Sequence, residues 1–279
     1  MENEKWKMKN EKWRMQKCRT KERNLDMKRI TESFAKAKSE NRGAFVAYLT
    51  MGYPTREASE AAADALIAGG ADIIELGVPF SDPFADGGVI RSAAYEALRQ
   101  GTTLADVLGI AASLRAKHPD TGLVLFSYYN LIFSMGLEKF AAAAAKAGVD
   151  AVLAVDLPLE EREELLAVLR PHGVGYVPLI APNTPMERVV ESAKGMDDSF
   201  LYVITVKGTT GERRELPPEL TERLDAIRAA VSVPIAAGFG ISTRAQADLI
   251  SRHADGFIVG SALVKRLDEK GTLAGAVLP

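Results

Sequence analysis

Three carboxylates lie within one short stretch of the chain, ELGVPFSDPFAD, which runs from Glu75 to Asp86. The overlapping run DIIELGV (72–78) is typical of a short buried strand, and the prolines and glycines after it forbid its continuation. Glu75 is therefore expected near the carboxyl end of a strand, with Asp82 and Asp86 in the following loop. Because carboxylates are seldom buried unless something uses or satisfies them, Glu75 is either a functional acid or a structural acid bonded to backbone amides.

The elements that must position these acids alternate regularly. Short, almost continuously apolar runs predict parallel strands covered on both faces, at 44–50, 72–77, 123–128, 149–155, 175–180, 200–206, 233–237 and 256–259. Ala-rich segments between them predict helices at 56–68, 103–117, 137–147, 160–170, 185–193, 218–230 and 243–251, with Thr55 and Ser242 as start signals for the first and the last of these.

Eight βα units in about 250 residues predict an α/β fold, a (β/α)8 TIM barrel in a single domain. The segment from about 27 to 39 is expected to form an extra N-terminal helix that caps the amino-terminal mouth of the barrel. The chain ends soon after the last strand, so we expect a shortened C-terminal helix. Active sites of this fold form at the carboxyl ends of the strands, which places the acid-bearing loop at the active mouth.

Composition excludes several classes of function. The 279 residues carry a net charge of -2 and are 47% hydrophobic, which gives no global attraction to nucleic acid or membrane. Cys18 is the only cysteine, and His118, His172 and His253 are scattered, so no metal site is expected. No apolar run reaches the roughly 18 residues needed to span a bilayer, and the amino terminus has no secretory signal, so we expect a cytoplasmic protein.

The first 26 residues differ from the rest of the chain. Residues 1–24 carry a local charge of +5, which leaves -7 for the remainder, and NEKWKM (3–8) recurs as NEKWRM (10–15). The composition predicts a disordered basic extension over 1–26, with a short amphipathic helix as the alternative. The barrel domain is expected to span 27–279.

Glycines follow each of the last three predicted strands, in KGTTG (207–211), GFGIS (238–242) and GSA (260–262). Glycine lets a backbone approach an anion closely, and amides at a helix start favour negative charge. Together the three segments predict a phosphate cradle, the alternative being turn glycines alone. The glycine-rich loop 207–217 is either a lid over the ligand or a mobile surface loop.

Polar residues also follow other strands, among them Thr50, Tyr128, Asn130 and Asp156, and Tyr202 lies within one. For Asn130 and Asp156, taken singly, the favoured interpretation is that of loop-capping groups.

These motifs resemble one family over residues 30–265, the tryptophan synthase alpha chain. The resemblance is carried by YLTMGYP (48–54), ELGVPFSDPFADG (75–87), YYNLIF (128–133), DLP (156–158), GTTG (208–211), GFGIS (238–242) and GSALVK (260–265). The second motif is highly specific, whereas GFGIS occurs in many phosphate-binding barrels.

The resemblance implies a carbon–carbon lyase that cleaves indole-3-glycerol phosphate to indole and glyceraldehyde 3-phosphate in L-tryptophan biosynthesis. Glu75 matches the catalytic glutamate that shuttles protons, and Asp86 matches the catalytic aspartate that accepts a hydrogen bond from the indole N–H. Asp82 matches the loop that faces the beta chain and is assigned to coupling with that partner.

The resemblance also implies two sets of binding residues. The phosphate contacts are Gly211, Gly240, Gly260 and Ser261, and the indole pocket is lined by Tyr48, Tyr128, Leu153 and Tyr202. The implied assembly is an alpha2beta2 heterotetramer with the beta chain, which carries pyridoxal phosphate, while this chain carries no cofactor and binds neither nucleic acid nor membrane.

The chain departs from the family pattern at some positions. Val206 and Lys207 stand where many members have Arg-Ser, Tyr53 stands where Asp is common, and Gly88 replaces a usual Pro. None of these changes touches Glu75 or Asp86. Two alternatives to a complexed lyase remain: a weakly active barrel that mainly activates a beta chain, and an autonomous indole-releasing lyase.

Overall fold

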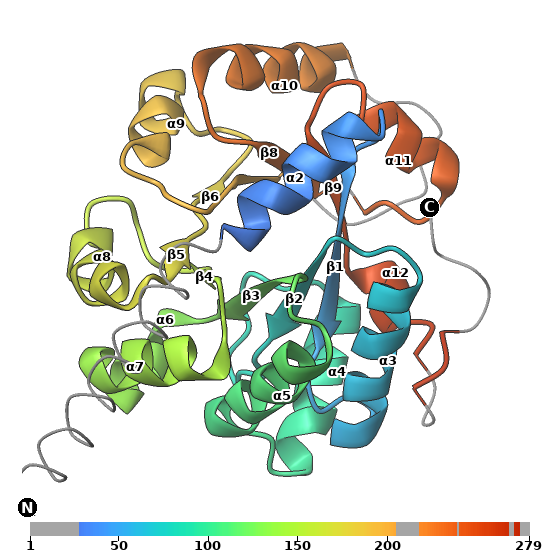
Figure 1. The fold of residues 1–279 in the computed structure, drawn as a ribbon, viewed down its shortest axis with the longest axis vertical. Coiled ribbons are helices and arrows are strands. Elements are labelled where there is room, and N and C mark those ends of the chain that lie inside the picture. Colours follow the sequence, from blue (N-terminus) through green and yellow to red (C-terminus); the bar gives the residue numbers. More distant parts are fainter. Residues whose placement is uncertain (1–27, 205–217, 239, 268–270, 274–279) are drawn as a thin grey trace, which may run out of the picture.

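The structure is a computed structural model, and it describes residues 28–204, 218–238, 240–267 and 271–273 (Figure 1). The predictions for the basic extension (1–26) and for the lid (207–217) fall outside the described residues, as does the phosphate-binding assignment of Gly211.

A curled parallel sheet forms the centre of the molecule (Figure 1). Its strands run in the order β5-β4-β3-β2-β1-β9-β8-β7-β6. Their bounds are β1 (Ala44–Thr50), β2 (Ile73–Gly77), β3 (Gly122–Ser127), β4 (Ala151–Ala154), β5 (Gly175–Tyr176), β6 (Leu179–Ile180), β7 (Leu201–Ile204), β8 (Ile235–Gly238) and β9 (Gly256–Val259). Apart from β5 and β6, each strand begins and ends within two residues of a predicted strand.

β5 and β6 are the two halves of the predicted fifth strand (175–180). Pro178 has no N–H to donate, which interrupts the hydrogen bonding along this strand and divides it into β5 and β6. Even so, the Val177 N–H donates to the Val152 carbonyl on one side, and the Pro178 carbonyl accepts from the Tyr202 N–H on the other. The segment therefore joins β4 to β7 and closes an eight-stranded barrel in the described part of the chain, which confirms the predicted fold.

Helices alternate with the strands and surround the barrel (Figure 1). They are α2 (Arg29–Ser39), α3 (Arg56–Ala68), α4 (Gly88–Arg99), α5 (Leu104–Lys117), α6 (Tyr129–Met135), α7 (Leu137–Ala147), α8 (Arg162–Leu169) with the 3-10 turn η1 (Arg170–His172), α9 (Met186–Ala193), α10 (Pro218–Ala230), α11 (Arg244–Ile250) and α12 (Ser261–Val264). Among these described helices, none is long and apolar enough to cross a membrane.

The helix-start predictions are confirmed at one position and wrong at another. The Thr55 side chain accepts a hydrogen bond from the Ala58 N–H and so caps α3. For α11, however, Thr243 and not Ser242 is the N-cap, because Thr243 forms a reciprocal capping box with Gln246. The sequence prediction also omitted α4 and α6, which lie inside the loops that follow β2 and β3.

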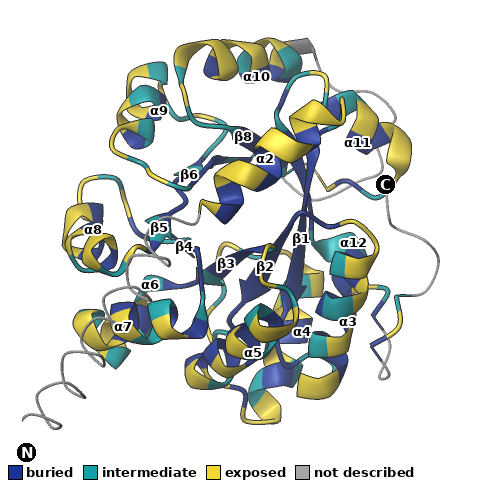
Figure 2. Ribbon diagram, in the orientation of Figure 1, coloured by how far each residue is buried: buried dark blue, intermediate teal, exposed yellow. Residues whose placement is uncertain are grey.

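The barrel interior is filled by alternate residues of the strands, and α2 closes its amino-terminal mouth. Ile30, Phe34 and Ala37 of α2 are buried against this interior, which confirms the predicted capping helix. Figure 2 shows the buried strands at the centre and the exposed outer faces of the helices. The inward strand residues packed with α2 include Val46, Ile73, Val124, Ala151, Leu153, Val177, Phe200, Ala236 and Ile258.

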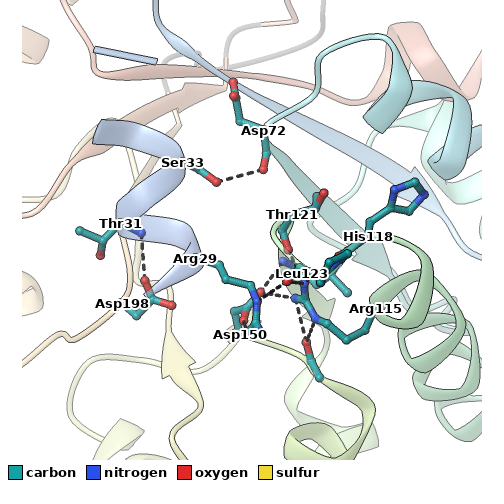
Figure 3. Close-up of polar contacts among 12 residues, drawn as sticks. Arg29, Thr31, Ser33, Asp72, Arg115, His118, Thr121, Leu123, Asp150 and Asp198 are labelled. Carbon is teal, nitrogen blue, oxygen red and sulfur yellow. Dashed lines mark hydrogen bonds and ion pairs between the residues drawn. The ribbon is translucent and has the colours of Figure 1, made fainter. Parts of the chain in front are cut away.

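A buried ionic cluster fastens α2 to the barrel (Figure 3). The Asp150 carboxylate accepts from Arg29 Nη1 of α2 at 2.8 Å and from Arg115 Nη2 of α5 at 2.6 Å. The same carboxylate accepts from the Leu123 backbone N–H of β3 at 2.8 Å. One side chain thus joins the cap, an outer helix and a barrel strand.

The carboxyl-terminal end carries little regular structure within the described residues. β9 is followed by the four-residue α12, and a single antiparallel bridge joins Leu267 to Leu273. The prediction of a shortened C-terminal helix falls partly on 268–270 and 274–279, which lie outside the described residues.

Candidate active site

Glu75 is the third residue of the five in β2, paired in register with Tyr48 of β1 and Val124 of β3. Its side chain is completely buried, and neither carboxylate oxygen has a hydrogen-bond partner among the described residues. Glu75 is therefore not a structural acid bonded to backbone amides. Burial raises its pKa to about 8, because an ionised carboxylate without partners is poorly stabilised away from water.

Asp86 lies in the loop between β2 and α4, at the rim of the barrel. Its Oδ2 accepts a hydrogen bond from the Tyr128 hydroxyl at 3.0 Å. Burial raises the pKa of Asp86 to about 6, although the bond from Tyr128 and the charge of Arg91 both act to lower it. At neutral pH the two acids thus differ in state: Glu75 is mostly protonated and Asp86 is mostly ionised.

Tyr48 and Tyr202 gather around these two acids. Burial raises the pKa of both tyrosines, and the charges of Glu75 and Asp86 raise both further. Tyr48 also pairs in register with Glu75 across β1 and β2, and we refer to Glu75, Asp86, Tyr48 and Tyr202 together as the tyrosine cluster. The Tyr48 ring also meets Phe126 edge-on, with ring centroids 5.1 Å apart.

Two glycines make room for the tyrosine rings. A Cβ atom on Gly77 would overlap the Tyr48 ring, and one on Gly238 would lie 2.9 Å from the Tyr202 hydroxyl oxygen. Both glycines end strands on the inward face, where any larger residue would push a ring aside. Because Gly77 and Gly238 have no side chains, the two tyrosine rings are able to lie against the barrel wall.

Of the predicted phosphate contacts, three are described. Gly240 is exposed and has a φ of +64°, a backbone conformation that favours glycine. Gly260 is the N-cap of α12 and Ser261 is its first residue. A Cβ on Gly260 would lie 3.4 Å from the Tyr48 ring, so this glycine adjoins the tyrosine cluster.

The other predicted site residues are distributed around this cluster. Leu153 of β4 is fully buried and pairs in register with Phe126. Asp82 is exposed and accepts a hydrogen bond from the Ser81 hydroxyl. Asp156 caps α6 by accepting from the Tyr129 N–H at 2.7 Å, which confirms its interpretation as a loop-capping group.

Phe126 is the site residue that the sequence analysis missed. It lies two residues after Val124, and the period of two along a strand puts both on the inward face. The alternation was available in the sequence, but a Phe in an apolar strand is equally suited to either face. Only its register with Leu153 and its edge-on contact with the Tyr48 ring place it beside the other candidate site residues.

The arrangement suits proton transfer to an aromatic ligand. A protonated carboxyl inside an apolar barrel is able to donate a proton, an ionised carboxylate at the rim is able to accept a hydrogen bond, and aromatic rings line the space. Among the described residues, no group of three or more His, Cys, Asp and Glu side chains is placed to hold a metal ion.

Fold and site together define a (β/α)8-barrel enzyme with a buried acid below the carboxyl mouth. The model of one family, the tryptophan synthase alpha chain, matches residues 34–277. The chain belongs to this family, and its activity is that of the family: the carbon–carbon lyase reaction that cleaves indole-3-glycerol phosphate in tryptophan biosynthesis.

Individual relatives agree with this assignment. The tryptophan synthase alpha chain of Rhizorhabdus wittichii is 45% identical over 251 residues, which are 89% of this chain and 91% of the relative. Tryptophan synthase of Mycobacterium tuberculosis superposes with a TM-score of 0.78 at 36% identity, covering 85% of this chain and 90% of that one. A structure of the tryptophan synthase a2b2 complex of Pyrococcus furiosus has a TM-score of 0.76 at 39% identity, covering 82% and 92%.

Proposed function

We propose that Glu75 carries the proton through both halves of the cleavage of indole-3-glycerol phosphate. The protonated Glu75 donates its proton to C3 of the indole ring, and the resulting carboxylate then accepts the proton of the hydroxyl on the adjoining side-chain carbon. The carbonyl forms, the bond from that carbon to C3 breaks, and its electron pair returns to the ring. Indole and glyceraldehyde 3-phosphate leave, and Glu75 is protonated again.

The observation that supports this role is the state of the Glu75 carboxyl. It is completely buried, has no partner among the described residues and has a pKa raised to about 8. A carboxyl that is protonated at neutral pH holds a proton that it can donate to carbon, and its conjugate base is basic enough to recover one.

Asp86 acts in this proposal on the indole nitrogen. Protonation of C3 makes the ring electron-poor, so the N–H becomes a better hydrogen-bond donor in the transition state than in the substrate. A fixed, ionised carboxylate at the rim therefore stabilises the transition state more than the ground state. The raised but still sub-neutral pKa of Asp86, about 6, keeps it ionised for this purpose.

The remaining residues bind the two ends of the substrate. We assign the indole ring to the pocket of Tyr48, Tyr128, Leu153 and Tyr202, and the phosphate to Gly211, Gly240, Gly260 and Ser261. Gly260 adjoins Tyr48, so the two sets meet at one edge of the mouth. We assign the whole activity to a single domain, 27–279.

We also propose that the carboxyl mouth docks on a beta chain. Asp82 is exposed there, and so are the apolar rings of Phe84, 75% exposed, and Phe133, 59% exposed. Exposed aromatic side chains beside an active site are typical of a surface that a partner covers. In this assembly, an alpha2beta2 complex, pyridoxal phosphate belongs to the beta chain and this chain needs no cofactor.

Indole release from indole-3-glycerol phosphate, with and without a beta chain, tests the function. We expect release in both conditions and faster release with the beta chain. No release under either condition contradicts the proposed lyase. Weak release in both conditions, together with a beta-chain reaction that this chain accelerates, favours a barrel that is chiefly an activating partner. Full release without acceleration favours an autonomous lyase.

The pH dependence of kcat/KM should be bell-shaped. Asp86 works as the carboxylate, so activity should rise as the pH passes its pKa of about 6, and Glu75 starts as the acid, so activity should fall as the pH passes about 8. Initial rates of indole release from pH 5 to 9 measure both limbs. A rate that keeps rising above pH 8 would contradict protonated Glu75 as the starting state.

A further inference from the structure

The hydroxyl of Tyr128 connects β3 to the loop that carries Asp86. Tyr128 is the N-cap residue between β3 and α6, and it is 2% exposed. Its hydroxyl oxygen accepts from the Ala85 backbone N–H at 3.1 Å and donates to Asp86 Oδ2 at 3.0 Å. One atom therefore holds both the carboxylate and the backbone immediately before it.

The ring of Tyr128 holds the same loop at two further points. It stacks on Phe80, with centroids 4.7 Å apart, and meets Phe84 edge-on at 5.5 Å. The loop from 80 to 86 is thus fixed at its start, middle and end by one side chain, which lies just after β3. A residue that only lined a ligand pocket would need none of these contacts with the loop.

The direction of the hydrogen bond to Asp86 follows from the chemistry of the pair. Burial raises the pKa of Tyr128 above its ordinary value, whereas the pKa of Asp86 is about 6, so the proton stays on the phenol. Because the phenol oxygen already accepts from Ala85, its hydrogen is free to point to Asp86 Oδ2. Among the described residues, no hydrogen bond reaches Asp86 Oδ1.

We propose that Tyr128 is a positioning residue for the cleavage, which holds Asp86 oriented and ionised so that Oδ1 accepts the substrate N–H. The inference rests on the proposed role of Asp86. The ring and the hydroxyl of Tyr128 have different roles: the ring shapes the loop, and the hydroxyl keeps the Asp86 carboxylate ionised.

Other groups around Asp86 cannot substitute for this hydroxyl. The titratable groups of the cluster come from other elements, namely Arg91 of α4, Tyr48 of β1, Glu75 of β2 and Tyr202 of β7. Among the described residues, only Tyr128 gives the Asp86 carboxylate a hydrogen bond. Its removal leaves burial opposed by the charge of Arg91 alone, so the Asp86 carboxyl should hold its proton to higher pH.

Tyr128→Phe tests the hydroxyl while it keeps the ring contacts. We expect kcat to fall by roughly 10- to 100-fold, as misplaced catalytic groups do, with a smaller change in KM. The acidic limb of the kcat/KM profile should move from about 6 to higher pH. The matched control is Tyr176→Phe, which removes the hydroxyl of another buried tyrosine, on β5, and should leave kcat and both limbs unchanged.

A second readout does not depend on turnover. Carbon NMR of protein with labelled Asp carboxyls, with the Asp86 signal assigned from its loss in Asp86→Asn, measures the pKa of Asp86 in the wild type and in Tyr128→Phe. A rise in the variant supports the inference even if the wild type releases no indole, in which case only the proposed function fails. An unchanged pKa of Asp86, or an acidic limb that does not move, overturns the role of Tyr128.

Discussion

Glu75→Gln is expected to lower the rate of indole release by at least about 100-fold and up to about 10,000-fold, the range that proton transfer by a positioned side chain contributes. Gln fills the same volume but has no proton to donate to carbon and cannot accept one from the hydroxyl. Binding should survive, because the phosphate and indole contacts are made by other residues. Single-turnover rates and the affinity for glyceraldehyde 3-phosphate, measured on the same preparation, separate the two effects.

The same substitution should change stability in a pH-dependent manner. The pKa of Glu75 is about 8 in the folded chain and about 4.5 for an ordinary Glu, so between these values the folded state binds more protons than the unfolded state. Glu75 therefore makes the wild type lose stability as the pH rises through this window, and the neutral Gln variant lacks this contribution. We expect the melting temperature of Glu75→Gln to gain on that of the wild type by several degrees between pH 5 and 8.5.

Glu57→Gln, at an exposed position in the first turn of α3, is the matched control and should follow the wild type at every pH. Turnover retained in Glu75→Gln would remove Glu75 from the mechanism. A melting-temperature difference that stays constant with pH would show instead that Glu75 is already ionised in the folded chain. The two measurements test the chemical role and the buried state separately.

Much of the fold is encoded in local stretches of the sequence. β1 and β9 begin and end where the apolar runs do, because a strand covered on both faces is continuously apolar and its ends are marked by polar or turn residues. The break at Pro178 and the helices α4 and α6 depend on tertiary context. A helix that starts at Gly88, after a proline-rich loop, has no start signal of its own, and its place against Tyr48 is what stabilises it.

The sequence predicts the candidate site less completely than it predicts the fold. The motif from Glu75 to Asp86 marks both acids, but the same twelve residues fit an acid bonded to backbone amides. The observation that favours a chemical role is that no donor of the described barrel reaches the Glu75 oxygens. This follows from the inward residues of several other strands. The bond from Tyr128 to Asp86 joins residues 42 positions apart, a pairing that no local pattern encodes.

Asp150→Ala is expected to cost about 3–5 kcal/mol of unfolding free energy, the range for removing one partner of a buried ion pair. The Asp150 side chain is 4% exposed and accepts from two arginines, Arg29 and Arg115. Without it both guanidinium groups lose the carboxylate that offsets their burial. The contrast is Asp197→Ala: the Lys28 pair of Asp197 is equally short, 2.6 Å, but that carboxylate is 80% exposed, so a change within about 1 kcal/mol is expected.

Urea unfolding of both variants measures the two losses of unfolding free energy. Similar losses would show that the buried cluster stabilises the fold no more than a surface ion pair does.

Asp150→Ala should also change the pH dependence of catalysis. Arg29 fastens α2 to the barrel (Figure 3). Ile30 and Phe34 of α2 fill the apolar interior below Glu75. A loosened cap admits water to that interior, and water favours the ionised carboxylate. The alkaline limb of the kcat/KM profile should then move below pH 8, because the acidity of Glu75 depends on the dryness that α2 maintains.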